Sequence, residues 1–258
     1  MVEIIGQKLE LADKVVRGDY AYPKKIDSLA TDVEIKPEEY ALVHQGEPGN
    51  LKADSAISMA QKFNGKNHLN TNIEVLKSGL AVPRTPKLAT QIINVNNALN
   101  EKGVLYDASG NLIEGERLRD YAHIINHNCR VWLNESFEKG NGFLDLDVVY
   151  ITGLRDGKPV FERESLQKCL EQDCYADLES VNSQGFPTRK SPIQKYEPGK
   201  SAYFFYPREN RAGRFDAVPD LAGFYCDRDP QFTVARLGVF SCAEGTHKNL
   251  RNKNSTNN

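Results

Sequence analysis

The sequence predicts an α+β fold, and three observations carry that prediction. Two segments with helical periodicity come first, and a series of short segments with strand character follows them. The strand candidates are separated by Gly, Pro and Asn turns rather than by crossover helices, which disfavours a doubly wound parallel sheet. No internal repeat is present. We therefore expect two helices packed on short, mostly antiparallel strands with extensive loops.

Residues 1–78 mix short amphipathic pieces with turn-rich stretches, and we expect them to form an N-terminal extension or subdomain. Within them, the segment DSAISMAQKF is expected to be a helix with Asp54 as its N-cap, because Asp accepts hydrogen bonds from the first backbone N–H groups of a helix.

Two helices are expected between residues 85 and 128. The first begins at Thr85 and Pro86, as cap and first-turn proline, and stops before Gly103. Its apolar face consists of Leu88, Ile92, Val95 and Leu99. A hairpin with a Ser-Gly-Asn turn is expected in VLYDASGNLIEG. The second helix, GERLRDYAHIINHN, is built on Leu118, Tyr121, Ala122 and Ile125.

Six short strand candidates follow the segment RVWLNESF. They are FLDLDVVYITGL, KPVFERES, KSAYFFYPREN, GRFDAV, AGFYCDRD and ARLGVFSCAEG. The polar, Asn-rich tail at residues 246–258 is expected to be disordered.

Composition excludes several classes of protein. With 33 Lys and Arg against 35 Asp and Glu, the chain has no basic footprint for nucleic acid or an anionic membrane. No signal peptide and no apolar run of about 20 residues is found, so no membrane insertion is expected, and cell surface, virion and cytoplasm all remain open as locations. Five cysteines at irregular spacing predict reduced, mostly buried thiols.

The segment from Ala212 to Cys242 has an unusual alternation. Small or apolar residues alternate there with residues of no consistent chemistry, in three runs of period two. Period two places the residues of a run on one face of an extended backbone. The irregular set is Asp216, Val218, Asp220, Gly223, Tyr225, Asp227, Asp229, Phe232, Val234 and Arg236.

From about Gly79 to Gly245 the chain resembles the variable proteins of diversity-generating retroelements, most of all the archaeal or archaeal-virus members. The resemblance is carried by PRTPKLATQIINVNNAL, LYDASGNLI, RVWLNESF, CLEQDCYADLESVNSQGFPT, AYFFYPRENRAGRF and LGVFSCAEG. It implies a C-type lectin fold of the formylglycine-generating-enzyme type at residues 79–245, with a variable region at about 212–242.

In such systems a reverse transcriptase rewrites the end of the gene at adenines, so that AAC or AAT codons become any NN-pyrimidine codon. These codons cannot encode Lys, Glu, Gln, Met or Trp, and all ten irregular positions obey that restriction. The resemblance therefore implies a receptor or adhesin-like protein without catalytic activity, whose ten variable residues bind a macromolecule, in the first place a protein.

This division of roles predicts which side chains are fixed and which bind. The fixed set, expected to pack inward or to shape the backbone, is Phe215, Ala217, Ala222, Phe224, Cys226, Pro230, Leu237, Gly238 and Val239. The ten variable side chains are expected to be exposed on one surface, which their four Asp residues would make acidic. Tyr225, Phe232 and Arg236 are the expected anchors, because interfaces favour these residue types.

Two other classes of protein remain as alternatives. One is an oxidising enzyme of the formylglycine-generating type, which needs a pair of nearby thiols, whereas Cys226 and Cys242 are far apart in sequence. The other is a structural virion or surface protein in which the segment is not diversified.

No metal or cofactor is expected. His123 and His127 share a helix face without a third ligand, and exposed acids are the simpler interpretation of Asp145 with Asp147 and of the cluster Glu171, Asp173 and Asp177. The sugar-binding triplets of calcium-dependent lectins are absent. The single tryptophan, Trp132, is expected to pack a helix against the sheet.

Overall fold

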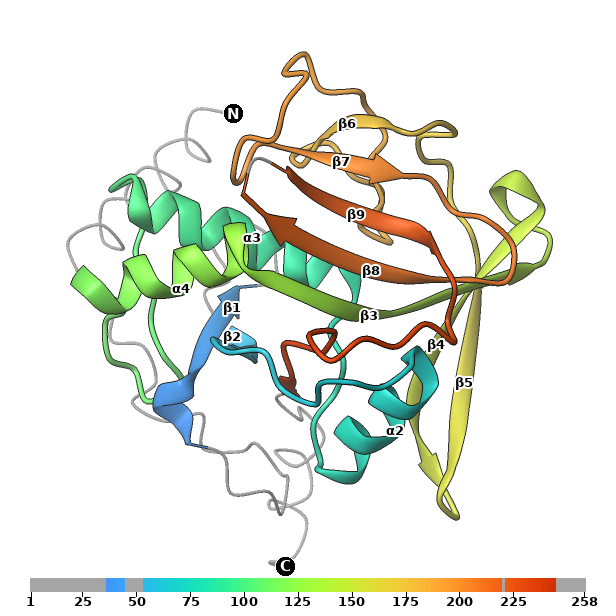
Figure 1. Ribbon diagram of the computed structural model, residues 1–258, viewed down its shortest axis with the longest axis horizontal. Helices are drawn as coiled ribbons and strands as arrows, with labels where there is room; N and C mark the ends of the chain where they lie inside the picture. The colour runs from blue at the N-terminus through green and yellow to red at the C-terminus, as the bar shows by residue number, and fades with distance from the viewer. Residues whose placement is uncertain (1–35, 45–52, 220, 245–258) are drawn as a thin grey trace, which may run out of the picture.

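Two β-sheets and three α-helices form the described part of the chain, residues 36–44, 53–219 and 221–244 of a computed structural model (Figure 1). The predicted α+β class is confirmed.

The larger sheet has seven strands in the order β5-β4-β3-β8-β9-β7-β6. All neighbouring pairs are antiparallel except β7 with β9, as expected for a mostly antiparallel sheet. The strands are β3 (Cys129–Lys139), β4 (Leu146–Arg155), β5 (Lys158–Ser165), β6 (Cys174–Asp177), β7 (Ser201–Phe205), β8 (Arg211–Val218) and β9 (Leu221–Arg228). A single 3-10 turn, Phe143–Asp145, precedes β4.

The smaller sheet joins the two ends of the described chain. It contains β1 (Tyr40–His44), preceded by a 3-10 turn at Pro37–Glu39, then β2 (Ala53–Ser58) and β10 (Cys242–Glu244), in the order β1-β2-β10. The predicted helix from Asp54 is wrong, because Ala53–Ser58 is the central strand of this sheet. Ala56 and Ile57 are both fully buried, because β2 has a strand partner on each side. The Asp54 capping signal is local and contains no information about these distant partners.

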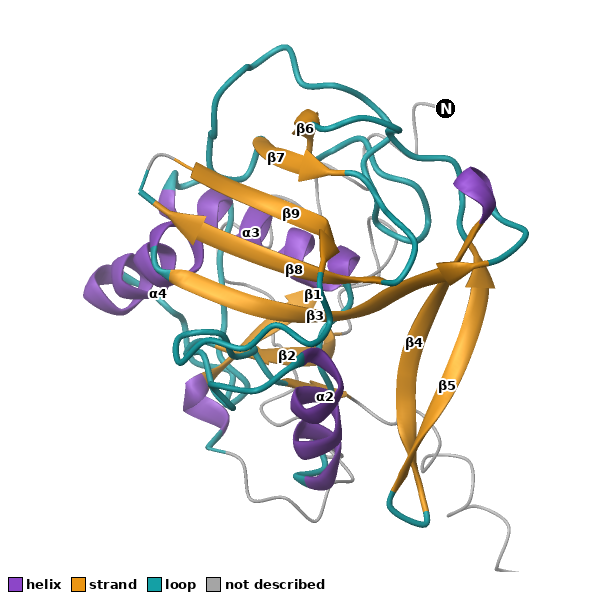
Figure 2. Cartoon of the chain, turned by 45° about the vertical axis from the view of Figure 1, so that its right-hand side comes forward, coloured by secondary structure: helices purple, strands orange, loops and turns teal. Residues whose placement is uncertain are grey.

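The two predicted helices are confirmed as α3 (Thr85–Leu99) and α4 (Gly115–His127). They lie on one side of the larger sheet and leave the opposite side of β8 and β9 uncovered by helix (Figure 2). Thr85 is the first helical residue rather than the cap, which is Arg84. The backbone N–H of Thr85 donates to the carboxylate of Glu135 in β3. Between the helices, the expected hairpin is reduced to one bridge, Tyr106 with Leu112.

A third helix, α2 (His68–Lys77), was not expected from the sequence. Its buried face is His68, Thr71, Asn72 and Val75, so it lacks the apolar periodicity that reveals an amphipathic helix. The side chain of Asn67 caps it by accepting from the Asn70 N–H at 2.9 Å.

Trp132 joins α2 to the sheet, as expected. Its indole N–H donates to the Lys66 carbonyl at 3.0 Å, and its ring forms a T-shaped pair with the His68 ring at 5.5 Å between centroids. Burial lowers the pKa of His68 to about 4, so the ring is neutral and its Nε2–H donates to the Leu133 carbonyl at 2.8 Å.

Five of the nine fixed residues predicted from the alternation lie on the inner side of β8 and β9, namely Phe215, Ala217, Ala222, Phe224 and Cys226. The other four, Pro230, Leu237, Gly238 and Val239, lie in the loop after β9. All nine are buried except Pro230, which is half-buried. The last strand candidate is wrong over most of its length, because only Cys242–Glu244 is a strand and residues 229–241 form an irregular loop beside β3. The predicted tail, 246–258, lies outside the described residues.

Residues 36–78 are continuous with the rest of the core. β2 pairs with β10, and Ala41, Val43 and Ile57 belong to the same cluster of buried residues as Leu88 and Phe215. The described part of residues 1–78 therefore shares both a sheet and a core with residues 79–244.

Candidate functional site

The side of β8 and β9 that faces away from α3 and α4 brings together much of the irregular set. We call it the outer face. In register, Asp216 lies opposite Gly223 and Arg214 lies opposite Tyr225. Residues directly opposite each other in an antiparallel pair share a face, and their neighbours in sequence point to the other side. The outer face thus contains Asp216, Val218, Gly223 and Tyr225 of the predicted set, and the loop after β9 adds the later members.

Exposure differs within the set. Asp229, Phe232 and Arg236 are exposed, and Asp216, Val218, Asp227 and Val234 are half-buried. Asp220 lies outside the described residues. The expectation of exposure is wrong for Gly223 and Tyr225, which are buried.

Gly223 is buried because a neighbouring strand approaches it closely. A Cβ at this position would lie 2.9 Å from the Tyr203 carbonyl oxygen, closer than a real Cβ contact. Gly223 is therefore restricted to glycine by the parallel pairing of β7 with β9.

Tyr225 belongs to a row of aromatic rings that crosses the outer face from β6 to β9. Its ring stacks on Phe205 at 4.3 Å between centroids, Phe205 meets Tyr203 at 4.8 Å, and Tyr203 meets Tyr175 at 5.1 Å. Tyr203 and Phe205 were not among the predicted site residues. The period of two within SAYFF is the sequence signal that could have revealed them.

Two arginines lie over these rings. The Arg228 guanidinium is 4.0 Å from the Tyr225 centroid, and the Arg214 guanidinium is 5.4 Å from the centroids of both Tyr225 and Phe232. Contacts of this kind are favourable, particularly where water is excluded. They connect the exposed Phe232 of the loop to the sheet.

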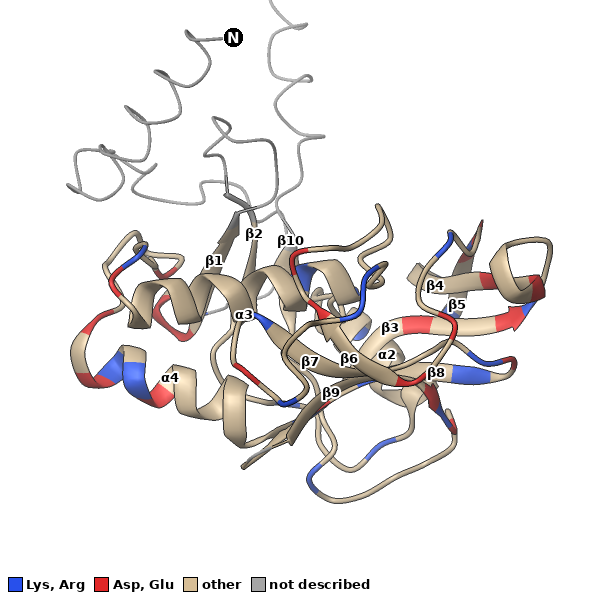
Figure 3. Cartoon of the chain, turned by 90° about the horizontal axis from the view of Figure 1, so that it is seen from above, with Lys and Arg blue, Asp and Glu red and all other residues tan. Residues whose placement is uncertain are grey.

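The expected acidic surface is wrong at two of its four Asp residues, Asp216 and Asp227, because arginines neutralise their carboxylates. Asp216 pairs with Arg214 at 2.5 Å, and Asp227 lies 3.7 Å from Arg228 and 3.9 Å from Arg208. Charges of both signs are spread along the elements of the described chain (Figure 3). The outer face is therefore mixed in charge and rich in Arg and aromatic side chains.

Burial governs the electrostatics of the Arg214–Asp216 pair. It raises the pKa of Asp216 and lowers that of Arg214, although each partner opposes the shift of the other. The effect of desolvation on the pKa of each ion is thus larger than the opposing effect of its partner's charge. Within the described protein, four polar atoms here have no hydrogen-bond partner: Nε of Arg214, Oδ1 of Asp216, Oδ1 of Asp227 and Nε of Arg228.

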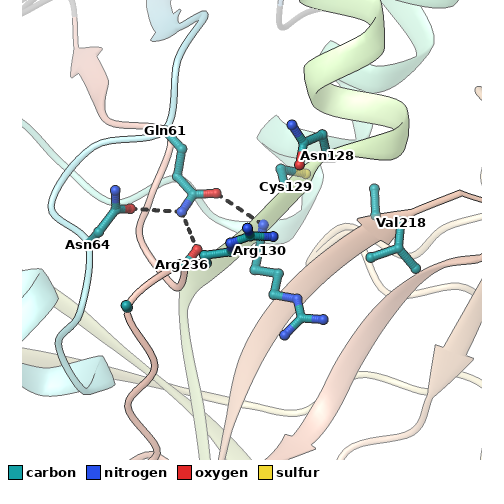
Figure 4. Close-up of a pocket in the computed structure, with 9 residues that line it drawn as sticks. Gln61, Asn64, Asn128, Cys129, Arg130, Val218 and Arg236 are labelled. Atoms are coloured by element: carbon teal, nitrogen blue, oxygen red, sulfur yellow. Dashed lines mark hydrogen bonds between the residues drawn. The ribbon is translucent and has the colours of Figure 1, made fainter.

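A cleft of about 260 Å³ lies at the end of the outer face nearest the C-terminus of α4 (Figure 4). Val218 and Arg236 of the predicted set line it, together with Arg130 at the start of β3. The other polar lining residues are Gln61, Asn64 and Asn128.

The cysteines are placed as buried thiols. Four of the five are buried and Cys174 is half-buried, and burial raises the pKa of Cys129, Cys169 and Cys226. A raised pKa disfavours the thiolate, which is the nucleophilic form. Cys226 and Cys242 are both buried, so neither is presented to a substrate.

The residues considered above as metal ligands either form ion pairs within the protein or lack a third ligand nearby. Asp173 binds Arg208 at 3.1 Å, and Asp177 binds Arg189. The His123 and His127 rings are 5.9 Å apart. In the described ranges, no three His, Cys, Asp or Glu side chains come together in a group that could hold a metal ion.

Comparison with protein-family models, with curated proteins and with solved structures found no match. In the part of the chain that is described, no helix combines the length and apolar character that a bilayer crossing requires.

Proposed function

We propose that this protein is a non-catalytic ligand-binding protein with a C-type lectin fold, whose outer face is diversified by a retroelement. The observation that carries the proposal is the agreement between two independent patterns. The alternation of the sequence from Ala212 to Cys242 separates residues by chemistry, and the two sides of β8 and β9 separate them in the same way. Within β8 and β9 the fixed positions fill the core and the irregular positions occupy the outer face, where Gly223 and Tyr225 are nevertheless buried. Both kinds of position occur in the loop after β9, and the irregular ones are the more exposed there.

The chemistry of the outer face supports a macromolecular ligand, in the first place a protein. Tyr225 and Phe232 are held by Arg214 and Arg228, and aromatic and Arg side chains supply most hot spots of protein interfaces. The proposed variable set becomes nine residues, since Gly223 is restricted by its backbone contact.

A non-diversified structural protein is the second candidate, and one observation favours it. Asp216 is bound within the protein to the buried Arg214, as a fixed residue would be. The oxidising enzyme is disfavoured by the burial of Cys226 and Cys242.

Two matched libraries distinguish the first candidate from the second. One draws NN-pyrimidine codons at the nine proposed variable positions, and the other draws the same codons at the nine fixed positions. Displayed variants are sorted for resistance to protease. We expect a much larger share of the first library than of the second to remain folded, because exposed changes cost about 0.5 kcal/mol and core changes several. Losses within the first library should concentrate at Asp216 and Tyr225, which have partners inside the protein. Equal losses in the two libraries would contradict the proposal.

A further inference from the structure

The cleft at the end of the outer face has an excess of hydrogen-bond donors. Arg130 and Arg236 are both exposed and line it, and neither forms an ion pair with any described residue. Arg208, Arg214 and Arg228, by contrast, each have an acidic neighbour. Asn64 and Asn128 add side-chain amides to the same cleft.

The side chain of Gln61 links the walls of the cleft, in addition to backbone hydrogen bonds such as that from the Gly238 N–H to the Arg130 carbonyl. Its Nε2 donates to Asn64 Oδ1 at 2.8 Å and to the Arg236 carbonyl, and its Oε1 accepts from the Arg130 backbone N–H at 3.0 Å. Figure 4 shows these three bonds joining the segment before α2, the loop after β9 and the start of β3. Both arginines therefore extend from a backbone that is already ordered, which lowers the entropic cost of binding.

The local charge favours an anion. No Asp or Glu lines the cleft. Asp216 is opposite Arg130 in register and attracts it, but the Asp216 carboxylate is bound to Arg214, whose positive charge offsets it. The C-terminus of α4, capped by Asn128, contributes about half a negative charge, which two full guanidinium charges outweigh.

The size of the cleft indicates what kind of ligand it takes. At about 260 Å³ it is smaller than the roughly 300–1,000 Å³ of sites that enclose a whole small molecule. It suits one charged group of a larger ligand. Guanidinium groups match planar or tetrahedral oxyanions through paired N–H donors.

We propose that this cleft is an oxyanion subsite, in which Arg130 and Arg236 bind a carboxylate or a phosphate group of a protein ligand. The inference rests on the proposed binding function, because it names the chemistry of one ligand group at the edge of the same face. Arg130 lies outside the proposed variable set and Arg236 within it. The subsite therefore combines a fixed cation with one that selection can change.

NMR titration of the full chain tests the subsite. Inorganic phosphate and acetate are added separately, at constant ionic strength, while the arginine Nε–H resonances and the backbone N–H resonances of the lining residues Gln61, Asn64 and Asn128 are followed. We expect saturable shifts confined to Arg130, Arg236 and these neighbours. The backbone resonances report binding in variants that lack the two arginines. We expect the double variant Arg130→Gln, Arg236→Gln to weaken binding at least about tenfold, since a hydrogen bond to a charged group is worth that much. Arg155→Gln, which removes the same charge at the exposed β4–β5 turn, is the control and should bind like the wild type.

A response to phosphate alone assigns the subsite to a phosphorylated ligand, and a response to acetate assigns it to an acidic side chain. The proposal is overturned if neither anion shifts the two resonances, or if the double variant binds as tightly as Arg155→Gln. Either failure leaves the library experiment unaffected, so loss of the subsite and loss of the proposed function are distinguishable.

Discussion

At the scale of single residues, Glu135 is a buried carboxylate that caps a helix distant in sequence. It is fully buried in β3, and one carboxylate oxygen caps α3 by accepting from the Thr85 N–H, while Oε2 has no hydrogen-bond partner. Burial raises the pKa of Glu135 to about 7 from its usual 4.5. The capping interaction comes from a residue 50 positions away, so the sequence near Thr85 could not reveal it.

Substitution of Glu135 by Gln should change how stability depends on pH. A raised folded-state pKa means that the contribution of this group to stability is complete below pH 4.5 and is lost as pH rises through about 7. Gln does not titrate. We expect the free energy of unfolding of the wild type minus that of the variant to fall by roughly 3 kcal/mol between pH 4.5 and pH 8. Urea denaturation at both pH values measures it, and a difference that is the same at both would show that Glu135 does not titrate in this range.

Gly223→Ala tests why one member of the alternating set departs from the rest. Because the added Cβ meets the Tyr203 carbonyl at 2.9 Å, we expect a loss of about 1–3 kcal/mol in the free energy of unfolding. Gly153→Ala is the matched control in β4, where no atom lies within 4 Å of the new Cβ, and it should cost under about 0.5 kcal/mol. If the two variants have the same free energy of unfolding, the contact with Tyr203 does not restrict position 223 to glycine, and Gly223 belongs to the proposed variable set.

At the scale of elements, periodic segments were predicted best. α3 and α4 carry apolar residues at helical spacing, and their ranges agree with the structure to within a few residues. α2 was missed because its buried face is mostly polar, and β2 was misread because its burial comes from strands that are distant in sequence. The alternation in β8 and β9 correctly predicted which residues face the core and which face outward. It did not predict that arginines would lie over the outward-facing aromatic rings. Arg214 and Arg228 carry no sequence signal that distinguishes them from solvated charges.

Asp216→Asn should reveal how strongly β8 depends on its internal ion pair. The change leaves the Arg214 guanidinium, whose side chain is 9% exposed, without its anionic partner. We expect the free energy of unfolding to fall by roughly 1–3 kcal/mol, by urea denaturation at pH 7. Asp229→Asn, at an exposed position of the same set, should stay within about 0.5 kcal/mol of the wild type. If Asp216→Asn changes the free energy of unfolding as little as Asp229→Asn does, the ion pair with Arg214 does not restrict which residues position 216 can hold.

At the scale of the whole molecule, residues from both ends of the described chain meet in one sheet. The sequence suggested an extension before residue 79, because no periodic pattern connects it to the rest. Strand pairing between β2 and β10 is a long-range contact that local patterns do not encode.

Deletion of residues 1–78 should therefore prevent folding. It removes β1, β2 and α2, and with them Ile57 from the main core. We expect residues 79–258 to lack a cooperative thermal transition by circular dichroism. Ile57→Ala in the full chain is the graded counterpart and should cost about 2–5 kcal/mol. A cooperative transition in the shortened chain would show instead that residues 79–258 form an independent domain.

The central claim is that the outer face is diversified for binding, and the comparison of many natural copies of this gene tests it most directly. The measurement is the distribution of codon differences between closely related copies. The account predicts differences concentrated at the nine proposed codons, with a nearby template copy that differs only at adenines, and few at the codons for the fixed residues such as Phe215 and Phe224. Differences spread evenly along the gene, or falling equally on variable and fixed positions, would contradict it.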